Sequence, residues 1–258
     1  MKKILLIASF LSVTATSCID NFNCIDGNGI PETQLRSISD FNHIVNSTAV
    51  DVIYKKADSV SINVMAESNL LGYIVTETVN DRLEIRTEPR TGCLDYRIQP
   101  VITVTSPELK TIESSGSGAL IADTMSGNPN TIELSGSGDI FIGSISSHDL
   151  SVTIYGSGDI DINRGLCKEA DILITGSGDL DIKGSSDNGK LRITGSGDIN
   201  SGQFMLLTAN ETVSGSGNIF TWVENGLTAT ISGSGNIYLK GNPTLNQTIT
   251  GSGKIIKY

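Results

Sequence analysis

The chain has 258 residues and a formal net charge of −10, from 18 basic and 28 acidic residues. Nucleic-acid binding depends on clustered lysine and arginine, so this balance excludes a nucleic-acid-binding protein. Only 38% of the residues are hydrophobic and 5% are aromatic, while 28 are glycine. This composition fits a thin β structure interrupted by glycine better than a thick globular core.

The N-terminal segment has the order of a targeting sequence. Lys2 and Lys3 precede an apolar run over residues 4–13, and small residues lead from there to Cys18. This order resembles a bacterial lipoprotein signal, so residues 1–17 are predicted to be a signal peptide and Cys18 to be acylated. Ala15 departs from the pattern, because leucine is commoner there. The lipid would anchor the mature chain to the outer membrane, since no other apolar run is long enough to span it.

The residues that follow are predicted to be irregular. Residues 18–35 are polar and rich in glycine and asparagine, which is typical of a flexible tether. Export favours disulfide bonds, and Cys24 and Cys93 are the predicted pair because both lie outside the regular repeats. Cys167 is interpreted as a small buried hydrophobe. The chain has no Cys-x-x-Cys motif and only two histidines, which argues against a zinc site.

Residues 36–113 show strand patterns without a clear repeat. Apolar and polar residues alternate in several short stretches, which predicts strands with one buried face. Ile44 lies eight residues before Val52, the same spacing that separates Ile132 from Ile140 further along the chain. This part is therefore predicted to form degenerate coils that cap the regular ones, as the end of a solenoid requires.

From residue 114 to the C-terminus the chain repeats itself. The triplet Gly-Ser-Gly occurs eight times, at steps of 20, 20, 20, 19, 20, 18 and 18 residues. Apolar residues alternate on both sides of each triplet, so each side is predicted to be a strand with one buried face. The triplets begin at Gly116, Gly136, Gly156, Gly176, Gly195, Gly215, Gly233 and Gly251.

Two architectures fit this period. In a meander each unit would be a hairpin, but tight hairpins prefer Asn-Gly or Asp-Gly to an unvarying Gly-Ser-Gly. In a solenoid each unit is one coil, and a stacked corner forces the same cramped backbone at the same place in every coil. Because parallel crossovers are right-handed, the prediction is an all-β, right-handed parallel β-helix with coils of about 20 residues. It would form one domain over residues 36–258.

The repeated Ser-Gly-Ser-Gly-Asp-Ile units, led by Arg36 and the run from Phe41 to Ile44, resemble a known family. That family is the auto-transporter adhesin head (GIN) domain, which is found in exported bacterial lipoproteins. The resemblance covers residues 36–258. It implies a right-handed β-helix and an adhesin-like role, and it brings no catalytic residues with it.

The residue after each triplet is the strongest candidate for chemistry. From the second triplet onward it is an aspartate in four successive coils, then asparagine in two and Lys254 in the last. Stacked carboxylates about 5 Å apart repel one another, so a Ca²⁺-binding ladder is one interpretation and the only cofactor considered. The other is aspartate at a turn that accepts nearby backbone N–H groups, which the change to asparagine and lysine favours. The four aspartates are Asp139, Asp159, Asp179 and Asp198.

An enzyme is weighed as an alternative. No histidine recurs beside the triplet serines, so they are predicted to form a hydroxyl ladder rather than a set of nucleophiles. Asp161 and Asp181 could act as paired carboxylates in a carbohydrate-active β-helix, with basic residues nearby. The short connectors build no deep cleft, so the chain is predicted not to be an enzyme. The basic residues are Arg164, Lys183 and Arg192.

Three aromatic residues have the opposite parity to the core positions. Phe141, Phe220 and Tyr238 are therefore predicted to form an outward row that could bind a glycan or a surface protein. The leading function is a non-enzymatic surface binding or adhesion module of the cell envelope. A structural envelope protein without a ligand site is the alternative from another class, and the oligomeric state is left open.

Overall fold

The computed structural model describes residues 24–88 and 93–258, and within them the chain is almost entirely β-strand. The first group of elements forms an N-terminal cap. These elements are β1 (Ile25–Asp26), β2 (Pro31–Arg36), β5 (Ser61–Glu67), the short 3-10 helix η1 (Leu71–Tyr73), β6 (Ile74–Val79), β7 (Arg82–Thr87), β8 (Leu94–Asp95) and β9 (Val101–Ser106).

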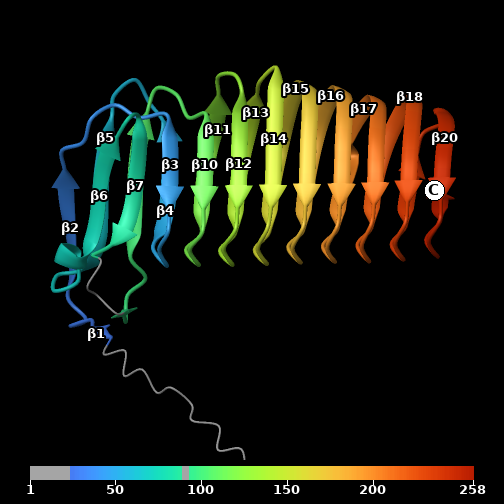
Figure 1. The fold of residues 1–258 in the computed structure, drawn as a ribbon. Coiled ribbons are helices and arrows are strands. Elements are labelled where there is room, and N and C mark those ends of the chain that lie inside the picture. Colours follow the sequence, from blue (N-terminus) through green and yellow to red (C-terminus); the bar gives the residue numbers. More distant parts are fainter. Residues whose placement is uncertain (1–23, 89–92) are drawn as a thin grey trace, which may run out of the picture.

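The remaining strands form the coils, which stack into a rod with the cap at one end and the C-terminus at the other (Figure 1). The coil strands are β3 (His43–Asn46), β4 (Asp51–Lys56), β10 (Thr111–Ser114), β11 (Leu120–Ser126), β12 (Asn130–Leu134), β13 (Ile140–Ser146), β14 (Asp149–Ile154), β15 (Ile160–Ile174), β16 (Leu180–Ile193), β17 (Ile199–Val213), β18 (Ile219–Ile231), β19 (Ile237–Lys240), β20 (Thr244–Ile249) and β21 (Ile255–Lys257).

The coils form a right-handed parallel β-helix, as predicted. On the front sheet β10 pairs in parallel with β12, and β12 with β14; on the back sheet β11 pairs with β13, and β13 with the start of β15. The strands β15 to β18 are long enough to turn the corner and belong to both sheets. In Figure 1 the front strands run downward and the back strands upward as the chain advances to the right, which is right-handed winding.

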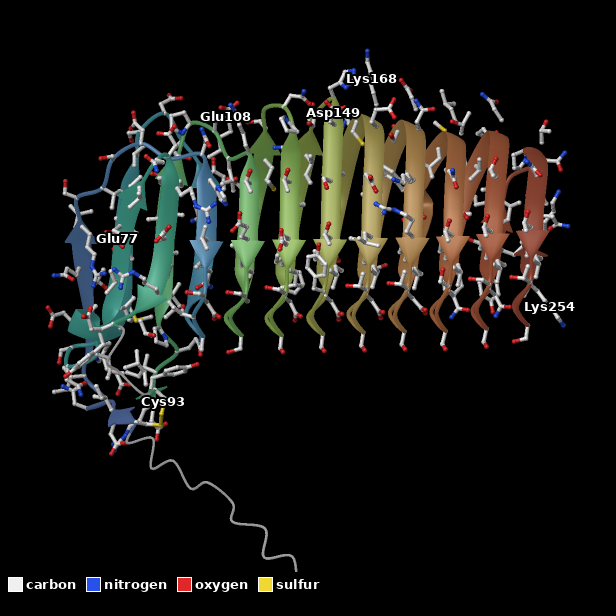
Figure 2. All side chains as sticks on the ribbon, in the orientation of Figure 1. Glu77, Cys93, Glu108, Asp149, Lys168 and Lys254 are labelled. Carbon is white, nitrogen blue, oxygen red and sulfur yellow. A yellow bond between two sulfur atoms is a disulfide. The ribbon has the colours of Figure 1, made fainter. Side chains whose placement is uncertain are left out.

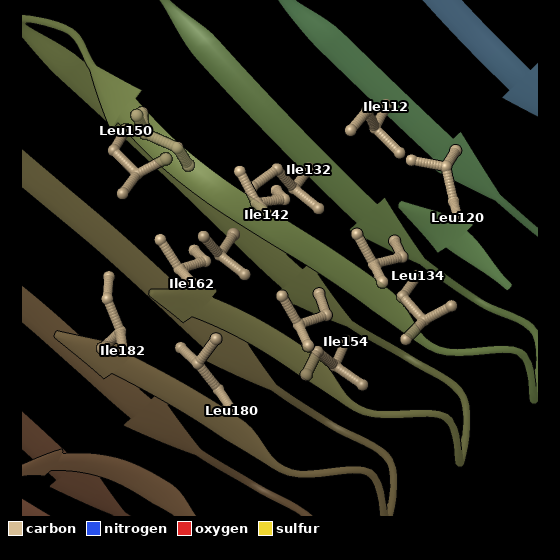
Figure 3. Close-up of a cluster of buried hydrophobic side chains, with 14 of the residues drawn as sticks. Ile112, Leu120, Ile132, Leu134, Ile142, Leu150, Ile154, Ile162, Leu180 and Ile182 are labelled. Carbon is tan, nitrogen blue, oxygen red and sulfur yellow. The ribbon is translucent and has the colours of Figure 1, made fainter. Parts of the chain in front are cut away.

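The core is a thin apolar layer between the two sheets. Alternate residues of each strand point inward, so equivalent residues such as Ile112, Ile132 and Val152 stack on one another and are fully buried. Figure 3 shows this layer, in which isoleucine and leucine side chains of the two sheets interdigitate. Burying one such side chain stabilises the fold by about 1.5–3 kcal/mol, so a narrow core suffices when every coil repeats it.

The Gly-Ser-Gly triplets form the lower corner of each coil, where successive backbones come very close. A Cβ placed on Gly176 would lie 2.0 Å from the carbonyl oxygen of Gly156, and one on Gly178 would lie 2.0 Å from that of Gly158. The same carbonyl of Gly156 accepts the N–H groups of Ser177 and Gly178. The glycines are therefore required by close backbone approach, since the positive-φ glycines of the described residues all lie outside the triplets.

The first coil confirms the alignment of its degenerate corner with the later ones. Ile44 is in register with Ile112, and Val52 with Leu120. Side-chain hydrogen bonds hold the backbone of this corner, which has no glycine triplet. The buried Asn46 donates to the carbonyl of Val50 (2.9 Å) and accepts from the N–H (3.1 Å) and hydroxyl (2.7 Å) of Thr48.

The cap differs from the predicted run of degenerate coils. The chain leaves the first coil after β4, builds most of the cap with residues 57–88 and 93–109, and returns at β10 to stack on the opposite side of that same coil. Within the cap β5 pairs antiparallel with β9, and β6 pairs antiparallel with β7. Antiparallel pairing thus replaces the parallel stacking of the coils at this end, although β9 still pairs in parallel with β4 of the first coil.

The predicted tether over residues 18–35 is wrong for its described part. β1 pairs with β8, and β2 pairs antiparallel with β5 as the outermost strand of the back sheet. The buried Glu67 accepts the N–H groups of Gly29 and Arg97, which fastens this segment to the cap. β2 is exposed along most of its length and has no apolar alternation, so hydrophobic periodicity could not reveal it.

Two sequence predictions fall on other parts of the chain. The signal peptide over residues 1–17 and the acylated Cys18 lie outside the described residues. In the stretch from residue 24 onward that the structure describes, no helix has the length and apolar character needed to cross a membrane.

Candidate binding surface

A groove of about 530 Å³ opens on the back sheet near the C-terminal end. It forms where the coils become shorter, since the step between triplets falls from 20 to 18 residues after Gly215. Ser201 of β17 is in register with Thr221, but Met205 is in register with Trp222, so residues 202–204 bulge without a partner in β18. Bulges of this kind re-aim side chains at the edge of a site.

The C-terminal residue closes one side of the groove. The hydroxyl oxygen of Tyr258 would lie 2.6 Å from a Cβ on Gly202, so the bulge must carry glycine for the phenol to sit there. The N–H of Tyr258 donates to the carbonyl of Leu239 (3.2 Å), which fixes its backbone. The polar lining comes from Asp181, Lys183, Asn200, Gln203 and Lys240.

The three predicted aromatic residues share one outward column of the back sheet, but they do not form one row. Phe220 and Tyr238 stack with ring centroids 4.5 Å apart and planes 5° apart. Phe141 lies four coils earlier, about 19 Å away at the usual strand spacing. The row is therefore interrupted by polar residues, and only Phe220 lines the groove. The column runs through Phe141, Asp161, Asp181, Asn200, Phe220 and Tyr238.

A second aromatic residue lies beside the groove on β18. The ammonium of Lys240 stands 3.8 Å from the centre of the Trp222 ring, a cation–π contact. The indole N–H of Trp222 donates to Glu224 (2.6 Å). This contact holds Lys240 at the groove while the carboxylate of Glu224 is engaged by the indole.

Charge is distributed unevenly along the rod. Residues 225–258 contain Lys240, Lys254 and Lys257 and not one aspartate or glutamate, although the whole chain has a net charge of −10. Figure 2 shows Lys254 at the C-terminal end of the rod and Cys93 at the cap. The groove therefore borders the basic end of an otherwise acidic molecule.

The aspartates after the triplets form an orderly hydrogen-bonded ladder. Asp139 Oδ1 accepts the N–H of Asp159 (3.0 Å), Asp159 Oδ1 accepts that of Asp179 (2.8 Å), and Asp179 Oδ1 accepts that of Asp198 (2.7 Å). The pattern continues through the asparagines to Lys254. This geometry matches the turn interpretation of these side chains.

The Ca²⁺ interpretation finds less support in the geometry. Among residues 24–88 and 93–258, no three His, Cys, Asp or Glu side chains gather as metal ligands would. Asparagine replaces aspartate in two coils and makes the same bond to the next N–H. A neutral amide oxygen therefore accepts the same hydrogen bond as the carboxylate.

The structure brings together only some of the residues weighed for catalysis, since Asp181 and Lys183 line the same groove. Asp161 and Asp181 are in register on the back sheet, but Arg192 lies on the front sheet, where it bonds Asp171. Asp181 accepts a hydrogen bond from the amide of Asn200 (3.4 Å). β15 turns the corner of its coil between Asp161 and Asp171, and β16 turns it between Asp181 and Arg192. The first residue of each pair therefore lies on the back sheet and the second on the front sheet.

The remaining predicted residues have structural positions. Of the triplet hydroxyls, those of Ser234 and Ser252 bond each other at 3.2 Å. Cys167 is half-buried against the core, and burial raises the pKa of its thiol. Cys24 and Cys93, the predicted pair, form a disulfide bond at the cap.

Several groove residues carry no motif that marks them in the sequence. Gln203 of β17, Lys240 of β19 and Tyr258, which follows β21, are far apart along the chain and meet only at the groove. The available signals were the fall in step from 20 to 18 residues and the absence of acidic residues after Glu224. Neither signal predicts which side chains line the same groove.

The fold places the chain in the parallel β-helix class. A family profile described as "Putative auto-transporter adhesin, head GIN domain" matches residues 40–243, which is most of the chain. The chain belongs to this family. No curated protein is similar enough to match it.

Solved structures show the same fold. A structure described as a putative lipid binding protein from Parabacteroides distasonis is 30% identical with a TM-score of 0.86, over 91% of this chain and 99% of that chain. A putative adhesin from Parabacteroides merdae is 24% identical with a TM-score of 0.77, over 91% and 98%. A putative adhesin from Bacteroides fragilis is 20% identical with a TM-score of 0.66, over 91% and 100%.

Proposed function

We propose that the chain is a non-enzymatic lipoprotein of the bacterial cell envelope that presents a binding surface for adhesion. The observation that carries this proposal is that the two ends of the rod differ. The cap holds the N-terminal end of the described chain, whereas Lys254 lies at the opposite end (Figures 1 and 2). The groove opens toward that end as well, since Lys240 and Tyr258 line it. A lipid on Cys18 would therefore leave the groove at the end far from the membrane.

The location is tested with an exposed cysteine near the groove end. Thr250 is exposed at the C-terminal end of the rod, so Thr250→Cys in a Cys167→Ser background offers one reactive thiol there. We expect a maleimide reagent too large to cross the outer membrane to label this variant on intact cells. Labelling only after the outer membrane is permeabilised would contradict a surface role and favour the structural alternative. A periplasmic protein with an exposed cysteine is the control.

The anchor is tested separately. Cys18→Ala removes the thiol that acylation requires, so the protein should move from the membrane fraction to the soluble fraction. Metabolic labelling with an alkyne fatty acid should mark the parent chain and not the variant. Fatty-acid labelling of the Cys18→Ala variant would overturn lipidation at Cys18. The surface location would still be decided by the maleimide experiment.

A further inference from the structure

We propose that the groove on the back sheet binds an acidic saccharide, one whose sugar rings carry anionic groups such as carboxylates. This inference deepens the proposed binding function and rests on it. It is carried by the juxtaposition of one free aromatic face, hydrogen-bonding side chains and two ammonium groups around the same groove. Its volume of about 530 Å³ lies within the range of roughly 300–1,000 Å³ that is usual for small-ligand sites.

The aromatic wall is the ring of Phe220. Tyr238 covers one face of this ring in a parallel stack. The other face is turned toward the preceding coil, where the column holds Asn200, a side chain too short to cover a phenyl ring. The C–H groups of a sugar ring are weakly positive and pack on the negative face of an aromatic ring.

The polar walls suit hydroxyl groups. Asp181 accepts hydrogen bonds, while Asn200 and Gln203 can both donate and accept them. Tyr258 is 63% exposed and presents its hydroxyl from the remaining side. The groove is open and most of its lining side chains carry polar groups, which fits a ligand that keeps much of its hydration better than an apolar chain, whose burial would require an enclosed apolar site.

The charge points to an acidic ligand. Lys183 and Lys240 line the groove beside Asp181, the one acidic side chain of the lining, so the side chains of the groove carry a net positive charge in a chain of net charge −10. Lys240 is positioned by the Trp222 ring rather than by a salt bridge, which leaves its ammonium free for an anion. The basic residues at this end of the rod would also attract a polyanionic glycan from within about one Debye length, roughly 8 Å at physiological salt.

The test measures binding of two matched oligosaccharides to the full chain, expressed with its leader and purified in a non-ionic detergent. The probes are a galacturonate tetrasaccharide and a galactose tetrasaccharide, titrated by calorimetry at low and high salt. We expect the uronate to bind at least about tenfold more tightly at low salt, because charge-assisted hydrogen bonds to ammonium groups are the strong ones. High salt should reduce this preference.

Variants locate the site. Lys183→Gln combined with Lys240→Gln should weaken uronate binding by about tenfold or more, whereas the exposed pair Lys55→Gln with Lys168→Gln should not change it. Phe220→Ser should weaken binding of any saccharide that uses the ring face. Far-ultraviolet circular dichroism checks that each variant keeps its β structure.

The outcomes separate the two proposals. Equal binding of both tetrasaccharides that only Phe220→Ser reduces would overturn the acidic class and keep the binding module. Uronate binding that is equally weakened by the control lysines would show a diffuse charge effect and overturn the groove as its site. Absence of binding to both probes would overturn this inference, while the labelling of Thr250→Cys on intact cells would still decide the surface location.

Discussion

Glu211 occupies a core position of β17, where the neighbouring coils place Leu191 and Ala229. It is fully buried, and neither carboxylate oxygen has a hydrogen-bond partner of good geometry. Desolvation raises the pKa of Glu211 from 4.5 to about 7, and the nearby hydroxyl of Thr221 opposes part of this shift. A buried carboxyl of this kind is favoured in its neutral form.

The pKa of Glu211 predicts a pH-dependent stability. A carboxyl whose folded pKa lies above its unfolded value contributes most below pH 4.5, and this contribution is lost as pH rises through about 7. The free energy of unfolding should therefore fall by about 3 kcal/mol between these limits through this residue alone. Glu211→Gln should lose this part of the dependence, measured as melting temperature at pH 5 and pH 8.

A surface glutamate supplies the control for this measurement. Glu133 is exposed on the front sheet, so Glu133→Gln should keep the parent pH profile. Identical profiles for Glu211→Gln and the parent chain would show that Glu211 does not titrate in the folded state over this range.

The triplet corner sets how closely two coils can stack. In Gly176→Ala the added Cβ meets a backbone carbonyl at 2.0 Å, and a backbone cannot yield as a flexible side chain can. We expect a loss of at least about 2 kcal/mol of stability, at the upper part of the range for overpacking. The exposed Ser177→Ala should change it by less than about 0.5 kcal/mol. Thermal unfolding followed by circular dichroism compares the two, and equal melting temperatures would refute the packing argument.

The aspartate ladder offers a second test between neighbouring coils. Asp159→Asn keeps an Oδ1 acceptor for the N–H of Asp179 and removes like-charge repulsion, so stability should be unchanged or slightly higher at low salt. Asp159→Ala loses the acceptor and should cost about 1 kcal/mol. The melting temperatures are then compared with and without millimolar Ca²⁺. A rise that Asp159→Asn abolishes would support the Ca²⁺ interpretation.

The molecule as a whole behaves as a one-dimensional stack with a distinct cap. Each coil contacts its neighbours, so damage at one end should not spread far along the rod. The disulfide between Cys24 and Cys93 joins residues 69 positions apart and ties β1 to the cap. Loss of such a bond costs about 2–5 kcal/mol in small domains.

Removing the disulfide should therefore loosen the cap and spare the coils. In the double variant Cys24→Ser and Cys93→Ser, we expect faster amide hydrogen exchange over residues 24–35 and unchanged exchange in β15 to β18. Mass spectrometry of peptides from both regions measures this. Equal acceleration throughout the rod would mean that the cap and coils unfold as one cooperative unit.

The regular coils were predictable because each residue repeats its role in every turn. The period of the triplets, the alternation around Ile132 and Ile140, and the matching spacing of Ile44 and Val52 all report local backbone geometry. Such geometry follows from strand periodicity and from the space that glycine leaves, so it can be read without knowing which parts of the chain meet. The pairing of Cys24 with Cys93 followed from their places outside the repeats.

Only the tertiary structure decided the cap and the groove. β2 is an exposed edge strand whose partner is set by distant residues, and its own alternation carries no signal. The groove depends on a bulge in β17, two shortened coils and the return of Tyr258 over Gly202, which are contacts between turns of the solenoid. Sequence periodicity determines the strands and the corner of each coil, because these follow from local backbone geometry. The packing between coils of unequal length determines where the regular surface is interrupted by a bulge or a groove.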